Sequence, residues 1–80
     1  MAKVHELKCW PEYFQAVYIG EKGFEVRKND RGFRVGDSLH LREWDPATGE
    51  YTGRWIVRLI TYVLQGKFGL PEDVCVMQLK

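Results

Sequence analysis

The residues with the clearest chemical capacity form the spaced set Gly20-x-Lys22-x-x-Glu25-x-Arg27. An arginine donates hydrogen bonds from a planar fork that suits a phosphate or a base edge. Glu25 could fix that fork, or accept a proton or a hydrogen bond from a ligand. Lys22 could supply a point charge or, in a desolvated pocket, a nucleophilic or basic amine. Because Glu25 and Arg27 are two residues apart, we expect their side chains on one face of a strand.

Further basic residues follow the motif, at Lys28, Arg31 and Arg34. From residue 22 to residue 34 there are five basic and two acidic side chains, a local charge of +3 in a chain whose formal net charge is +1. This clustering predicts a footprint for phosphates. The alternatives are an ordinary surface salt bridge for the motif acid and arginine, a helix-terminal charge for the motif lysine, and solvated loop charges for Arg31 and Arg34.

Aromatic side chains could add stacking surfaces to such a site. Trp10 lies at a predicted strand-to-helix junction next to the motif and is the first candidate for stacking on a base, with Trp44 second. Tyr13 could line the same cleft. The alternative for Tyr13 and for all three tryptophans, including Trp55, is packing in an aromatic-rich core.

The elements that must position these side chains follow from hydrophobic patterning. Alternation predicts strands over 4–10, 23–28 and 38–44, with Glu25 and Arg27 facing away from Phe24 and Val26. β-Branched and aromatic residues predict a strand over 54–65, and residues 74–80 are expected to form the closing strand. "PEYFQAVYI" predicts a helix over about 11–19, with proline at its first position and Gly20 ending it. Residues 45–53 carry Asp-Pro and Gly turn signals and are expected to form a long hairpin connection.

These elements predict one α+β, mainly β, domain over residues 1–80. Five strands with one short helix after the first strand favour a small, closed or nearly closed β-barrel. "MAKVHELK" lacks the apolar segment of a signal peptide, and "WIVRLITYVL" is too short to span a bilayer and contains Arg58. We therefore expect no membrane partner and a cytoplasmic location.

Metal, cofactor and thiol chemistry are not expected. His5 and His40 each alternate into a strand, and no third ligand has zinc spacing, although His5 stays a minor site candidate. Cys9 and Cys75 also lack metal-ligand spacing and are expected to be buried as small hydrophobes, with a single bridge between them left open. The oligomeric state is undetermined.

The motif and its context resemble a known family. Gly20-x-Lys22-x-x-Glu25-x-Arg27 matches the GxKxxExR motif of the ASCH domain family, within the PUA-like superfamily. "HELKCWPEYFQAV…GEKGFEVRKNDRGFRVGDSLHLREW" is similar to a small branch of uncharacterised bacterial and phage proteins, over nearly the whole chain. The resemblance implies a β-barrel with a helix beside a cleft, and a role in binding RNA or a modified nucleoside.

Two other functions stay open. Some ASCH-family proteins resemble amidohydrolases acting on acylated nucleosides, in which the motif lysine is central; that would make Lys22 the base or nucleophile and Glu25 a proton carrier. Those enzymes tend to carry a threonine where this chain has Glu25, and the alternatives to it, Ser38 and Thr52, lie outside the motif. The other alternative is a protein-interaction module of a mobile element, which an exposed aromatic patch would favour.

Overall fold

A computed structural model describes all of residues 1–80, and the fold is mainly β, as expected. Five strands and one helix follow one another along the chain. Their bounds are β1 (Val4–Cys9), α1 (Pro11–Tyr18), β2 (Phe24–Lys28), β3 (Ser38–Asp45), β4 (Glu50–Gln65) and β5 (Val74–Leu79). The predicted helix and all five predicted strands are therefore present, within a few residues of their expected ends.

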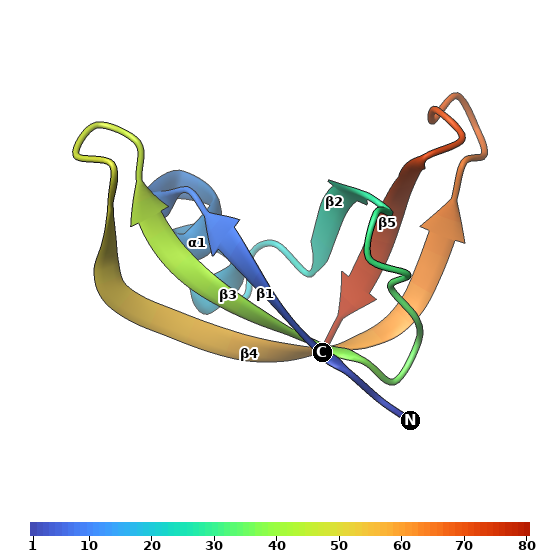
Figure 1. Ribbon diagram of the computed structural model, residues 1–80, viewed down its shortest axis with the longest axis horizontal. Helices are drawn as coiled ribbons and strands as arrows, with labels where there is room; N and C mark the ends of the chain where they lie inside the picture. Colours follow the sequence, from blue (N-terminus) through green and yellow to red (C-terminus); the bar gives the residue numbers. More distant parts are fainter.

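The strands form one strongly bent sheet in the order β1-β3-β4-β5-β2. β4 has 16 residues and crosses the whole molecule, pairing first with β3 and then with β5 (Figure 1). β1 lies parallel to β3, whereas the other neighbours are antiparallel. The sheet is not closed into the expected barrel, because β1 and β2 are its two edges and do not pair with each other.

The helix covers part of the inner, concave face of this sheet. Pro11 occupies the first turn of α1, and Gly20 just beyond its end has a φ of +84°, which an L side chain rarely adopts. Phe14 and Val17 point from α1 into the core, where a Phe side chain contributes about 1.5–3 kcal/mol by burial. The structure contains no helix with the length and hydropathy needed to cross a membrane.

The core is aliphatic rather than rich in tryptophan. Its members are Leu7, Cys9, Phe14, Val17, Phe33, Leu39, Leu41, Ile56, Ile60, Cys75 and Met77. The alternative of core packing is wrong for Trp10 and Trp55, which are both exposed. One eight-residue helix covers only the inner face of the sheet, so Trp55 on the outer face meets solvent.

The connection between β3 and β4 is shorter than expected. Residues 50–53, assigned to a loop by their composition, belong to β4. The register shifts here, because Arg42 pairs with Trp55 but Trp44 pairs with Tyr51. The extra residues of β4 form a bulge around Gly53, whose φ is +95°. Bulges re-aim side chains, and beside this one the Thr52 hydroxyl bonds to Glu43 of β3.

Two arginine side chains bridge the gap between the sheet edges. Nη2 of Arg27 in β2 donates a hydrogen bond to the carbonyl of Lys8 in β1, at 2.6 Å. Nη1 of Arg31, in the loop after β2, donates to the carbonyl of Glu6, at 2.7 Å. These side chains connect β1 to β2 and the loop after it, where the two edge strands do not pair through their backbones.

Candidate functional site

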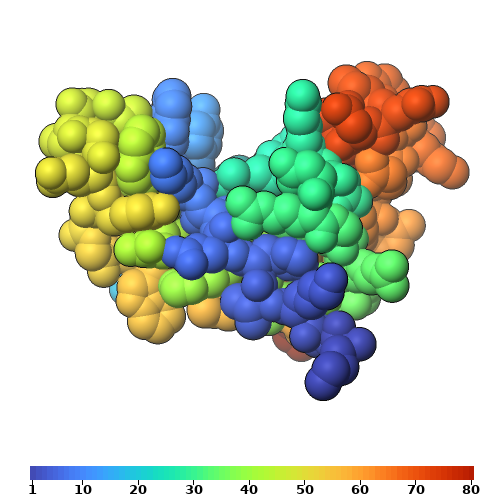
Figure 2. All heavy atoms as spheres, viewed as in Figure 1, coloured from blue at the N-terminus to red at the C-terminus, as the bar shows by residue number.

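A cavity of about 490 Å³ opens between the β1–α1 junction and β2, a volume within the range of small-molecule sites. Figure 2 shows the surface hollowed between the blue early chain and the green segment around β2. The end of β1 and the start of α1 contribute Lys8, Cys9, Trp10 and Tyr13 to its lining. The segment entering β2 and β2 itself contribute Lys22, Glu25, Val26 and Arg27.

The three charged residues of the motif form one ion-paired cluster in this lining. Nζ of Lys22 lies 2.9 Å from Oε1 of Glu25, and Nε of Arg27 lies 2.7 Å from Oε2. The Glu25 side chain is 6% exposed, whereas those of Lys22 and Arg27 are 19% and 29% exposed. The carboxylate is therefore the buried centre of the cluster, and its two cations are the more accessible groups.

Strand register explains why the cluster points inward. Glu25 and Arg27 sit opposite Met77 and Cys75 of β5, and both of these residues are fully buried. Side chains directly opposite each other lie on the same face of a sheet, so the motif acid and arginine face the interior. Lys22 reaches them because its backbone N–H still bonds to the carbonyl of Ala16, which keeps the turn after α1 tight.

Hydrogen-bond donors remain available on both cations. Lys22 carries three N–H groups, of which one meets Glu25. Nε and Nη2 of Arg27 both contact Glu25, and Nη2 also donates to the carbonyl of Lys8. Nη1 therefore makes no hydrogen bond within the chain. The cluster can therefore donate to a ligand without first losing its internal bonds.

Aromatic rings complete the cavity. Trp10 and Tyr13 are 49% and 51% exposed although both line it. Core packing, the alternative expected for Tyr13, is therefore wrong. Nζ of Lys22 lies 5.9 Å from the centroid of the Tyr13 ring and 5.0 Å from that of Phe24. Cations and aromatic faces thus share one small space, which suits a flat, polar-edged ligand.

The Cys9 thiol lies in the same lining but is not a nucleophile. Burial raises its pKa to about 11, and the negative charge of Glu25 adds to the increase. Burial likewise raises the pKa of Cys75. Both cysteines are buried, as expected, and both are free thiols. At neutral pH they are therefore protonated and act as small apolar groups.

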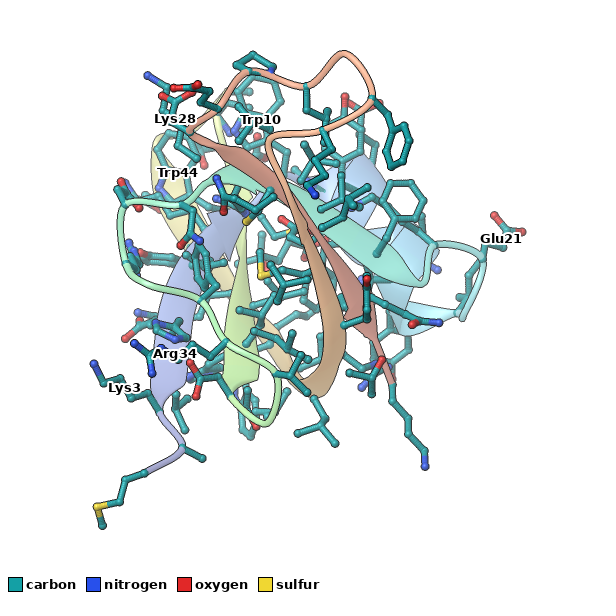
Figure 3. All side chains as sticks on the ribbon, turned by 90° about the vertical axis from the view of Figure 1, so that its right-hand side faces the viewer. Lys3, Trp10, Glu21, Lys28, Arg34 and Trp44 are labelled. Atoms are coloured by element: carbon teal, nitrogen blue, oxygen red, sulfur yellow. The ribbon has the colours of Figure 1, made fainter.

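The other predicted basic residues do not line the cavity. Lys28 is well exposed, and its Nζ lies 3.9 Å from a carboxylate oxygen of Asp73. Arg31 is directed to the carbonyl of Glu6. Figure 3 places Lys28 toward the same end of the molecule as Trp10, and Arg34 beside Lys3 at the opposite end. The basic residues therefore do not form one continuous surface around the motif.

Arg34 borders a second, smaller hollow that a buried carboxylate organises. Oδ1 of Asp37 accepts the backbone N–H of Lys3 at 2.9 Å, and Oδ2 accepts that of Arg34 at 3.2 Å. Nε2 of His5 lies 2.8 Å from Oδ2. The hydrogen bond from His5, followed by that from Lys3, lowers the pKa of Asp37. His5, the minor site candidate, thus joins the N-terminus to the turn before β3 and does not reach the motif.

A third buried carboxylate, Glu43, went unpredicted as a charged centre. Thr52 in the β4 bulge donates its hydroxyl to Oε1 at 2.6 Å, and Nη1 of Arg54 lies 3.8 Å from Oε2. The guanidinium carbon of Arg54 lies 4.9 Å from the ring centroids of both Phe14 and Tyr18. This cluster fastens α1 to the sheet. The sequence feature that could have revealed it is the position of Glu43, which alternates with Leu39 and Leu41 on the apolar face of the strand over residues 38–44.

The structure also constrains metal and hydroxyl chemistry. No group of three or more His, Cys, Asp or Glu side chains is arranged to hold a metal ion. Neither Ser38 nor Thr52 lines the cavity, so the two hydroxyls considered as partners for Lys22 are not beside it. Tyr13 supplies the one hydroxyl among the lining side chains.

Comparison with known proteins places the chain in a family. A family model described as "Domain of unknown function (DUF3850)" matches residues 4–79. The chain belongs to this family. It is also 46% identical, over 63 residues, to an uncharacterized 12.9 kDa protein in the GpA 3' region of Escherichia phage P2. That alignment covers 79% of this chain but 56% of the phage protein, so the chain spans a little over half of that relative's length.

The family match includes every residue of the cavity. Lys8 and Val26 line it but were not singled out from the sequence. Lys8 could have been suspected because it directly precedes the Cys9-Trp10 junction. Val26 carried no such signal, since alternation placed it on the face of β2 opposite to Glu25 and Arg27.

Proposed function

We propose that this chain binds RNA, through an unstacked base or a modified nucleoside held in the cavity between α1 and β2. The observation that carries the proposal is the convergence of Lys22, Glu25 and Arg27 with the accessible rings of Trp10 and Tyr13. Sequence-specific RNA recognition uses this combination, in which splayed bases stack on aromatic rings and bond through their edges. The resemblance to the ASCH domain family, and a cytoplasmic location suited to two free thiols, belong to the same proposal.

The phosphate contacts in this proposal come from a limited set of side chains. Lys28 is exposed and lies toward the Trp10 end of the molecule, so it is available to a backbone leaving the cavity (Figure 3). Arg31 would first have to release the carbonyl of Glu6, and Arg34 lies too far away. We therefore expect a shallow salt dependence, with about one or two phosphates neutralised.

The first experiment is an amide NMR titration of isotope-labelled protein with a short degenerate single-stranded RNA at low salt. Shifts should cluster on the cavity residues, and Trp10→Ala should weaken binding by about tenfold or more, because one stacked base contributes roughly 1–3 kcal/mol. Trp55→Ala is the matched control, since Trp55 is also exposed but lies on the outer face. Equal losses in the two variants, or no shifts at all, would overturn the proposal.

The hydrolase alternative is tested in the same sample with an acylated nucleoside. Product signals that grow with time and vanish in Lys22→Ala would replace the binding module by an enzyme. The ammonium of Lys22 is paired with Glu25, and the Cys9 thiol is protonated, so the cavity presents no activated nucleophile. We expect the acylated compound to bind without turnover.

One observation favours a protein-interaction module as the second candidate. Tyr51, Trp55, Val57 and Leu59 all expose apolar surface along β4. A protein partner on that strand would perturb outer-face amides, whereas RNA should perturb cavity amides. The same spectra therefore distinguish the two functions.

A further inference from the structure

The motif cluster has a defined order of hydrogen-bonding groups. Lys22 and Arg27 bond to different oxygens of one carboxylate, Oε1 and Oε2, so Glu25 lies between two donors. All three side chains line the same cavity. The order presented to a ligand is therefore donor, acceptor, donor.

Each member of this array keeps capacity for one more bond. A carboxylate oxygen has two lone pairs, and Oε1 of Glu25 accepts one bond, from Lys22. Lys22 retains two N–H groups, and Nη1 of Arg27 is not engaged. A ligand can thus be bound by the array as it stands.

Among nucleobases, one kind of edge complements this order. Uracil and thymine carry an imide edge, in which an N3–H donor lies between the O2 and O4 acceptors. Its carbonyls would accept from Lys22 and Arg27 while N3–H donates to Glu25. Cytosine has an acceptor at N3 and an amino donor at C4, so two of its three groups would face groups of their own kind. A buried polar group left unpaired in this way costs more than the bond itself contributes.

Building on the proposed function, we propose that the cavity selects a pyrimidine with an imide edge, with Lys22, Glu25 and Arg27 reading O2, N3–H and O4 and with Trp10 or Tyr13 stacking on the ring. Glu25 is then a specificity-determining residue as well as the anchor of its two cations. The cavity volume of about 490 Å³ admits the base together with its ribose.

The test compares the binding of uridine, thymidine, cytidine and N3-methyluridine 5′-monophosphates by calorimetry. Uridine and thymidine monophosphates should bind with similar affinity. The cytidine and N3-methyl compounds should bind at least about tenfold more weakly, which is one factor of ten in Kd for each mismatched edge. Equal affinity for all four compounds would overturn the edge assignment while leaving the binding function intact. Failure of all four and of single-stranded RNA would overturn both.

Variants at two buried glutamates separate the edge assignment from a general loss of structure. Glu25→Gln places an amide N–H₂ among donors and should remove the preference for uridine over N3-methyluridine monophosphate. Glu43→Gln changes a buried carboxylate outside the cavity and should keep that preference. Retained preference in Glu25→Gln, with a folded amide spectrum, would overturn the role of Glu25.

A last comparison identifies the source of the base. Oligouridylate that binds more tightly than uridine monophosphate would indicate a base within RNA, and equal binding would indicate a free nucleotide. Both outcomes keep the imide-edge preference. Oligocytidylate that binds as tightly as oligouridylate would overturn it.

Discussion

Glu25 and Asp37 are both buried carboxylates, but they are held by different kinds of partner. Asp37 accepts two backbone N–H groups and a hydrogen bond from a buried histidine, so its partners are fixed by the fold. Glu25 is held by two side chains that are themselves partly exposed to a cavity. A carboxylate with fixed partners stabilises the chain, whereas one whose partners are partly exposed can share them with a ligand.

The largest expected effect of this difference is on stability. In Asp37→Asn, the new amide N–H₂ would face the backbone N–H of Lys3 or Arg34, or His5. These groups are held in place by the fold. We expect the free energy of unfolding to fall by about 3 kcal/mol, because buried donors lose their acceptor. Urea unfolding measures this loss of free energy, and Asp30→Asn, at an exposed residue, is the control. A loss no larger than the control's would contradict the structural role of Asp37.

Acid should act on the same residue. The folded state lowers the pKa of Asp37 below 3.8, so the unfolded chain takes up this proton first as the pH falls. The contribution of Asp37 to stability is therefore complete above about pH 4 and is lost as the pH drops through the lowered pKa. The difference in free energy of unfolding between the unmodified chain and Asp37→Asn should therefore be smaller at pH 3 than at pH 7. Parallel declines would exclude Asp37 as a source of acid sensitivity.

The isosteric change at the motif should cost less. In Glu25→Gln the cations of Lys22 and Arg27 can turn toward the cavity and hydrate, so we expect the free energy of unfolding to fall by about 1 kcal/mol. The measurement is the same urea titration, beside Asp37→Asn. A larger loss at Glu25 than at Asp37 would reverse the comparison and make the motif primarily a folding element.

The smallest effect is expected at the exposed pair. Lys28→Ala removes a contact of 3.9 Å between well-exposed groups, so stability should change by less than about 0.5 kcal/mol. If Lys28 contacts a phosphate, the salt slope of RNA binding should fall by about one. An unchanged slope would restrict the interface to the cavity itself.

Local patterns predicted much of this arrangement, and long-range pairing accounts for what they missed. Alternation correctly placed Glu25 with Arg27 on one face of β2, away from Phe24 and Val26. Alternation reports the face of a strand and not its neighbour, so the parallel β1–β3 pair and the open sheet could not be predicted.

Exposure of Trp55 was missed for a related reason. Burial depends on which face the helix covers, and composition does not specify that. Trp10 was nevertheless correctly placed beside the motif, because its position at the junction of a strand and a helix is a local feature.

The arginines that bridge the two edges of the sheet also have a consequence beyond this fold. An exposed strand edge is a template for pairing with other chains, and the carbonyls of Glu6 and Lys8 would be acceptors for such an incoming strand. Arg31 and Arg27 already occupy both acceptors. An open sheet can thus resist self-association and fibre growth without closing into a barrel. Arg27 also lines the cavity, so a ligand that draws its guanidinium away from the carbonyl of Lys8 would expose that acceptor on the edge of β1.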